Sequence, residues 1–346
     1  MVNGTVSSLI VDNSDGSSLS STCTPFPEDL SGVQLSQLNI SRKACVDLRQ
    51  AQQNNDVRAI CMDLDASSKV TGDNVVIDTS NATVRGQITG TSALWLHNAQ
   101  AGAGVVEAHS GSSMTCSSCA LKMSLAGSDV TLGGTMSGST VEIQGLQKLD
   151  HTGSLTASGS QLTIAAETAS FSGIVRCTGS ACSSLVSVNH TLNLGGNLQC
   201  TNGKCTLSMR SGGDITSTAT ISCSGNNQCL VDVASDSSAS FGGSIAASDI
   251  RMVIAESLRL QGTVSSNGQG FAEVSGDGKG NRPAWSSTSY NDYFRVSGSG
   301  GGHGGNGAAA CYRYSTSWVL PAGNHACSRS FTQTHTHLHT HTIKHR

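Results

Sequence analysis

The sequence predicts an all-β protein that winds into a parallel β-helix, a β-solenoid with rungs of about 23 residues. Three observations predict this fold. Small cysteine loops recur at that interval, a glycine motif follows the same spacing, and short segments alternate apolar with polar residues. Only 4% of the residues are aromatic, so the core must consist of small branched side chains, which suit the narrow interior of a solenoid.

Three cysteine loops are the clearest marker of the repeat. Their sequences are CTGSAC, CTNGKC and CSGNNQC, and their first cysteines are 23 residues apart. Their second cysteines are 23 and then 24 residues apart. A fixed period of this size is typical of a solenoid. The loops run from Cys177 to Cys182, from Cys200 to Cys205, and from Cys223 to Cys229.

The glycine motif is an apolar residue, a spacer, a glycine and a further apolar residue soon after. Several of its copies lie one or two periods apart: Phe171 and Leu194 are separated by 23 residues, Val84 and Leu132 by 48, and Leu194 and Phe241 by 47. The copies are VRGQI at Val84, LGGTM at Leu132, FSGIV at Phe171, LGGNL at Leu194, FGGSI at Phe241 and LQGTV at Leu260.

Segments in which apolar and polar residues alternate predict the strands. TGDNVVI (71–77) and AGSDVTL (126–132) begin with a small turn and continue with alternating apolar residues, as strands with one buried side do. Each period holds about three short strands and three turns, and at about 3.3 Å per residue this length closes one rung. We expect residues 71–264 to form a right-handed coil of roughly eight rungs.

Composition divides the chain into three parts. Residues 1–62 lack the pattern and are predicted to be an N-terminal cap or irregular segment over the open end of the coil. Residues 63–266 are predicted to be the parallel β-helix. Residues 267–346 hold a glycine tract and the sequence THTHLHTHT, which predict an irregular, disordered low-complexity tail.

Charge and cysteine content bear on partners and compartment. The net charge is −3, no basic patch indicates nucleic-acid binding, and no apolar run is long enough to predict a membrane span. The first residues show no signal peptide, yet thirteen cysteines are typical of an oxidising compartment. We therefore expect an extracellular or cell-surface protein that starts upstream of Met1 and continues into further repeats of a longer parent.

Residues 71–264 resemble the parallel β-helix arrays of large cell-surface and secreted repeat proteins, adhesin-like and pectin-lyase-like ones among them. The tract GSGGGHGGNG resembles glycine-rich segments in large surface proteins of plants and protists. The resemblance implies an extracellular structural or adhesive role, and it carries no catalytic residues over to this chain.

The loop cysteines admit two pairings. A vertical ladder, such as Cys177 to Cys200, is within disulfide range because neighbouring rungs lie close together. Closure within each loop is favoured, since every copy carries its own pair and a ladder of three would leave one cysteine over. Zinc is an alternative, because CSSC at Cys116 and Cys119 has a ligand spacing, although no nearby histidine completes a set of four. Thirteen is odd, so one thiol is free or bonds outside the chain.

The densest charged patch is the best candidate for catalysis. VDVASD contains Asp232 and Asp236, and Arg210 and Asp214 lie one rung earlier. Polysaccharide cleavage needs clustered carboxylates, or a carboxylate with a basic residue, on one exposed face. The alternative for these residues is a solvated strand face and turn.

Alternating histidines near the end of the chain are candidates for loose binding of a transition metal, and they are His335, His337, His339 and His341. A Thr-His repeat is also what a CA dinucleotide repeat encodes, so an alternative interpretation of the tail is translation of non-coding DNA by read-through. No cofactor is predicted. The favoured hypothesis is a non-enzymatic extracellular scaffold or adhesive surface that contacts glycans or matrix. The alternative is a carbohydrate-active β-helix enzyme, a polysaccharide lyase or hydrolase.

Overall fold

The computed structural model describes residues 8–13, 23–27, 30, 33–49, 56–98, 103–224, 229–265, 296–297, 311–314, 317–319 and 339–340. Within these ranges the chain forms strands and turns and no α-helix, which confirms the all-β prediction. The chain divides into two compact units, residues 1–266 with 337–346, and residues 267–336. No helix among the described residues is long and apolar enough to cross a membrane.

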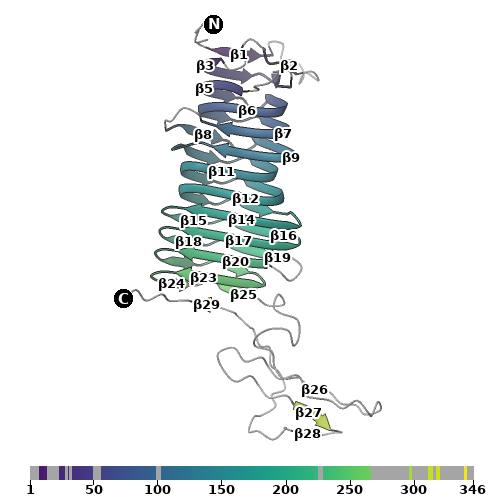
Figure 1. The fold of residues 1–346 in the computed structure, drawn as a ribbon, viewed down its shortest axis with the longest axis vertical. Coiled ribbons are helices and arrows are strands. Elements are labelled where there is room, and N and C mark those ends of the chain that lie inside the picture. The colour runs from purple at the N-terminus through teal and green to yellow at the C-terminus, as the bar shows by residue number, and fades with distance from the viewer. Residues whose placement is uncertain are drawn as a thin grey trace. The chain divides into compact units, whose positions relative to one another are not determined.

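The first unit is a stack of short strands that coil rung upon rung, from purple to green in Figure 1. All of its strand pairs are parallel, so the predicted parallel β-solenoid is confirmed. The strands are β1 Leu9–Asp12, β2 Thr24–Pro25, β3 Gln34–Ser41, β4 Cys45–Asp47, β5 Asp56–Leu64, β6 Lys69–Val84, β7 Gln87–His97, β8 Val105–Ala108, β9 Ser113–Ser124, β10 Asp129–Leu132, β11 Thr135–His151, β12 Ser154–Phe171, β13 Ile174–Cys177, β14 Ala181–Val188, β15 Leu192–Leu194, β16 Asn197–Thr201, β17 Lys204–Ser211, β18 Ile215–Ser217, β19 Thr220–Ser224, β20 Cys229–Ser235, β21 Ala239–Phe241, β22 Ser244–Ala246, β23 Asp249–Ile254, β24 Leu258–Leu260, β25 Thr263–Ser265 and β29 His339–Thr340.

The coil has three faces, which we name by the strands that stack on them. Face A contains β13, β16, β19 and the strands in register with them, face B contains β14, β17 and β20, and face C contains β15, β18 and β21. The long strands β6, β11 and β12 bend at the corners and contribute to all three faces.

Rungs are about 22 residues apart, and the coil makes about 10 turns. The prediction of roughly eight rungs covered residues 71–264 alone, whereas the coil also includes strands within residues 1–62, and several of its rungs are shorter than 23 residues. Thr135, Ser154 and Ile174, which are in register on face A, are separated by only 19 and 20 residues.

Inward side chains stack on their equivalents in the next rung and form one continuous core. Each fully buried aliphatic side chain contributes roughly 1.5–3 kcal/mol, and no single rung could bury its own apolar face. The column on face A consists of Val70, Ile88, Met114, Met136, Leu155, Val175, Leu198, Ile221 and Ile245.

The glycine motif marks the corner between faces C and A. A Cβ on Gly173 would collide with the carbonyl oxygen of Gly153, and a Cβ on Gly196 would collide with that of Gly173. Backbones of successive rungs therefore touch at this corner, and glycine is the residue that permits the approach. The spacing seen in the sequence is the rung spacing at this contact.

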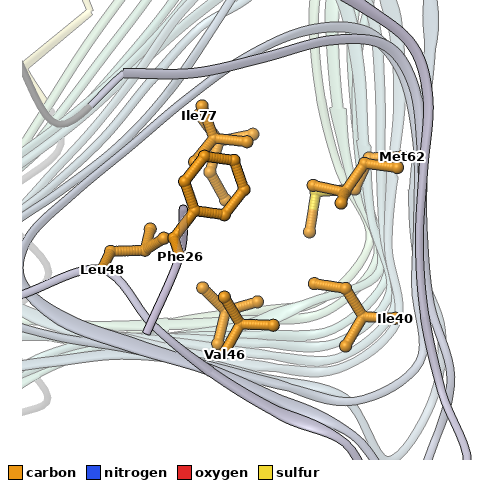
Figure 2. A pocket seen from close by; sticks show the side chains of 9 residues that line it. Phe26, Ile40, Val46, Leu48, Met62 and Ile77 are labelled. Carbon is orange, nitrogen blue, oxygen red and sulfur yellow. The ribbon is translucent and has the colours of Figure 1, made fainter. Parts of the chain in front are cut away.

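Parallel pairing begins within residues 1–62, ahead of the boundary expected at residue 63. β1 pairs with β3, and β3 pairs with β5. Figure 2 shows Phe26 beside Leu48 and Ile77 at this end of the core, in an apolar hollow that Ile40 and Met62 also line. The amide of Phe26 donates a hydrogen bond of 2.9 Å to the Asp47 carbonyl. An aromatic side chain thus fills the first rungs.

The second unit contains a small antiparallel sheet of β26 Val296–Ser297, β27 Cys311–Tyr314 and β28 Ser317–Val319. Most of the predicted low-complexity tail, including the glycine tract, lies outside the described residues.

Candidate functional site

The cysteine loops occupy the corner between faces A and B. Cys177 ends β13 on face A, and Cys182 lies in β14 on face B. The rung before Gly72 has Leu48 at the corner position on face A, whereas from Gly72 to Cys223 this position holds a cysteine or a very small residue. In chain order these residues are Gly72, Gly90, Cys116, Gly138, Ala157, Cys177, Cys200 and Cys223.

Three disulfides close across this corner. Cys177–Cys182 and Cys223–Cys229 lie within their own loops, with Cα atoms 6.1 and 5.6 Å apart. Cys116–Cys119 closes the same corner several rungs earlier. The CSSC sequence that suggested zinc is therefore a corner disulfide. A fourth bond, Cys23–Cys45, lies near the start of the coil.

The middle loop differs from the prediction, because Cys200 and Cys205 are free thiols. The Cys205 thiol donates to the Asn202 carbonyl at 3.3 Å, within a turn where Asn202 and Gly203 have positive φ. The Cys200 thiol donates to the Cys182 carbonyl at 3.9 Å. Each thiol thus has a backbone acceptor in place of a disulfide partner.

The two thiols lie close to a third sulfur. The Sγ atoms of Cys200, Cys205 and Cys223 are all within 4.8 Å of one another, and all three residues are buried. Burial raises the pKa of the Cys200 thiol, because a thiolate loses its hydration there, and the neighbouring Cys205 adds to the shift. Among the cysteines whose side chains are described, the one other free thiol is Cys61, which is exposed.

The acidic candidates do not come together. Asp232 is on face B, where its carboxylate lies 3.6 Å from the Arg210 guanidinium and 3.9 Å from that of Arg251. Asp214 and Asp236 are at the corner between faces B and C. The hydroxyl of Ser237 donates to Asp214 at 2.7 Å, and this bond is the main cause of that carboxyl's lowered pKa. Asp232 is therefore an ion-paired carboxylate between two arginines, and no second carboxylate of the described part of the chain is ion-paired with them.

Of the alternating histidines, the structure describes one. His339 lies in β29, which pairs with β23 so that His339 is in register with Arg251. His335, His337 and His341 lie outside the described residues.

An aromatic site on face B was missed by the sequence reading. Trp95 is 40% exposed, although it lies in the middle of β7. Its indole stacks on the His97 ring with centroids 4.4 Å apart, and His97 Nδ1 lies 4.0 Å from the Asp78 carboxylate. In the following rungs Lys122 and Glu142 form an ion pair of 3.2 Å.

The alternation of side-chain directions along the strand sequence ALWLH could have predicted that Trp95 is exposed. Leu94 and Leu96 point into the core, so the residue between them must point outward. Because Trp95, Lys122 and Glu142 are in register on successive strands, they form one outward column.

A histidine inside the core has no catalytic arrangement around it. His151 is buried against Phe171, with ring centroids 5.8 Å apart, and neither of its nitrogens has a hydrogen-bond partner among the described residues. Burial lowers its pKa from 6.5 to about 4, so the ring is neutral at physiological pH.

No protein-family model matches the chain, and comparison with curated proteins and with solved structures found no match. The geometry of the coil and of its faces therefore carries the functional argument.

Proposed function

We propose that the protein is a non-enzymatic extracellular β-solenoid, a scaffold or adhesive surface that contacts glycans on face B. The observation that carries the proposal is the exposed Trp95 indole, held by its stacking on His97 and followed by the column of Lys122 and Glu142. A pyranose ring offers apolar C–H groups to an aromatic face and hydroxyls to charged neighbours, so this combination suits a glycan better than an apolar peptide.

The rigidity of the coil supports the scaffold part of the proposal. Strands of about 10 turns pair continuously in parallel, and the corner disulfides tie neighbouring strands of a rung together. Side chains on such a surface keep their positions without ordering on binding, which lowers the entropy cost of contact. Four disulfides also fit an oxidising compartment such as the cell exterior.

Binding to a panel of immobilised neutral and acidic polysaccharides tests the proposal. Trp95→Ala should weaken binding about tenfold, since an aromatic contact contributes up to about 1.5 kcal/mol. Val105→Ala is the matched control, because Val105 is a similarly exposed apolar residue on a strand of face C. Absence of binding by the unaltered protein would refute glycan contact, and equal binding by Trp95→Ala would place the contact elsewhere.

The enzymatic alternative is tested on the same panel. Release of oligosaccharides that is lost in Asp232→Asn would show turnover at the Arg210–Asp232–Arg251 group and would refute the non-enzymatic proposal. We expect no release with either protein.

A further inference from the structure

Two buried thiols lie between two disulfides at one corner of the coil. On face A, Cys200 is in register with Cys177 of the preceding rung and Cys223 of the following rung. On face B, Cys205 is in register with Cys182 and Cys229. The six residues thus form two parallel columns, and each sulfur has one neighbour within its loop and others in the adjacent rungs.

The sulfur atoms of the second and third loops lie close together. The Sγ atoms of Cys200, Cys205 and Cys223 lie within 4.8 Å of one another, and Cys223 is bonded to Cys229. Parallel neighbours in a sheet lie about 4.8 Å apart, and this separation is within the Cα distance range of disulfides. A thiol beside a disulfide in such geometry is the starting arrangement for thiol–disulfide exchange.

We propose that the cysteines of the second and third loops form one thiol–disulfide exchange unit, in which the reduced pair moves between the rung of Cys200 and Cys205 and the rung of Cys223 and Cys229. This redox function of the corner is independent of the glycan contact on face B. It gives the repetition of the loops a chemical consequence, since only stacked copies can exchange.

The exchange balances without an outside oxidant or reductant. The Cys200 thiol loses its proton, and the thiolate attacks Sγ of Cys223. A Cys200–Cys223 bond forms, the Cys223–Cys229 bond breaks, and Cys229 leaves as a thiolate that takes up a proton. Cys205 then loses its proton and attacks Sγ of Cys200, which closes Cys200–Cys205 and releases Cys223 as a thiol. Two thiols and one disulfide are present before and after.

Burial controls the rate of this exchange. The reactive form is the thiolate, and burial raises the pKa of Cys200, so the thiolate is scarce at neutral pH. Below that pKa the thiolate fraction, and with it the exchange rate, should rise about tenfold for each unit of pH. The pairing is therefore slow to change near neutrality and faster in mild alkali.

The chain contains a control disulfide at the same corner. Cys116–Cys119 has glycines in register with Cys116 on both sides, Gly90 before it and Gly138 after it. No sulfur in the described neighbouring rungs can attack it, so its pairing should stay fixed under all conditions that move the others.

Peptide mapping without reduction tests the proposal. The folded full chain is incubated at pH 6 and at pH 9, quenched with acid, alkylated under denaturing conditions and digested. We expect two populations, one with Cys223–Cys229 closed and one with Cys200–Cys205 closed, which interconvert much faster at pH 9, while Cys116–Cys119 stays a single species. A fixed pairing at both pH values, or all three loops closed with no thiol to start exchange, would overturn the proposal.

Two variants trap the intermediate. Cys205→Ser removes the second attack, so the Cys200–Cys223 bond should accumulate with Cys229 alkylated. Cys200→Ser is the complementary variant, in which Cys205 should attack Cys223 in the same way, and it keeps the test valid if one variant fails to fold. Exclusive recovery of Cys223–Cys229 from both folded variants at pH 9 would also refute the exchange.

Discussion

The rungs between Lys69 and Phe171 and the rungs between Ile174 and Ser265 are built differently. In the first half β6, β11 and β12 are 16, 17 and 18 residues long and run through the corners. In the second half the strands are 3–8 residues long and end at each corner. At the corner between faces A and B the first half continues within one strand, whereas the second half uses separate loops.

The corner between faces A and B shows the cause. At Gly138 the chain turns so tightly that an added Cβ would lie 2.7 Å from the Thr140 carbonyl oxygen and 3.1 Å from Leu121 Cβ. The cysteine loops place four or five residues between the corner positions, and the disulfide or thiol side chains fill the added space. A solenoid can thus vary its rung length at a corner while the three faces keep their register.

Gly138→Val, at a tight corner, should cause the largest loss of stability among these variants. Its side chain cannot fit without displacing backbone, so we expect the free energy of unfolding to fall by roughly 3–4 kcal/mol. Cys200→Val, at the equivalent position of a wide corner, should cost about 1 kcal/mol or less. Thermal or denaturant unfolding measures both, and equal losses would contradict the distinction between tight and wide corners.

His151→Leu should reduce the loss of folding stability at acidic pH that His151 causes in the first half. The folded pKa of His151 is lowered from 6.5 to about 4, so between these values the unfolded chain binds the proton and the folded chain does not. Stability is therefore complete above pH 6.5 and falls as the pH drops toward 4, by about 3 kcal/mol in all.

The register indicates why leucine should fit there. His151 stacks on Phe171, and Phe171 on Leu194, so the column accepts apolar residues. Urea unfolding of both proteins at pH 7, 5.5 and 4 measures the effect. If the free energy of unfolding falls with pH equally in His151→Leu and in the unaltered chain, His151 is not the source of the pH dependence.

The double variant Cys177→Ser, Cys182→Ser should lower the local stability of one rung of the second half. A bond across so short a loop contributes about 2 kcal/mol, and in a solenoid the loss acts on the rung and its neighbours. Hydrogen exchange should become faster in β13 and β14 and stay unchanged in β9. Loss of protection along the whole coil would show that the stack unfolds as a single unit.

Asp232→Asn should have the smallest effect. Its partners Arg210 and Arg251 are mostly exposed, and surface ion pairs of this kind contribute about 0–1 kcal/mol. The melting temperature should shift slightly and depend weakly on salt. Lys122→Ala is the matched variant, because it removes an exposed ion pair of the first half. A loss well above 1 kcal/mol would mean that face B depends on this charge.

The difference between the halves also explains how far the sequence could be read. In the second half Ile174, Asn197 and Thr220 recur every 23 residues, and the cysteines make the period visible. In the first half the spacing of the same positions varies, with Gln87 followed by Ser113 and then Thr135. No constant period exists there, so the sequence predicts the start of the coil at residue 63 and a cap in residues 1–62.

By itself, the sequence determined the strand alternation, the glycine motif and the position of the cysteine loops, because each depends on residues close together in the chain. Only the tertiary structure decided what the stacking of rungs brings together. It placed Trp95 above Lys122, buried His151 beside Phe171, set Asp232 between two arginines, and left Cys200 and Cys205 as thiols between two disulfides. Those neighbours are a whole rung apart in sequence, and the rung length that selects them is set by the corners, whose tightness depends on packing in three dimensions.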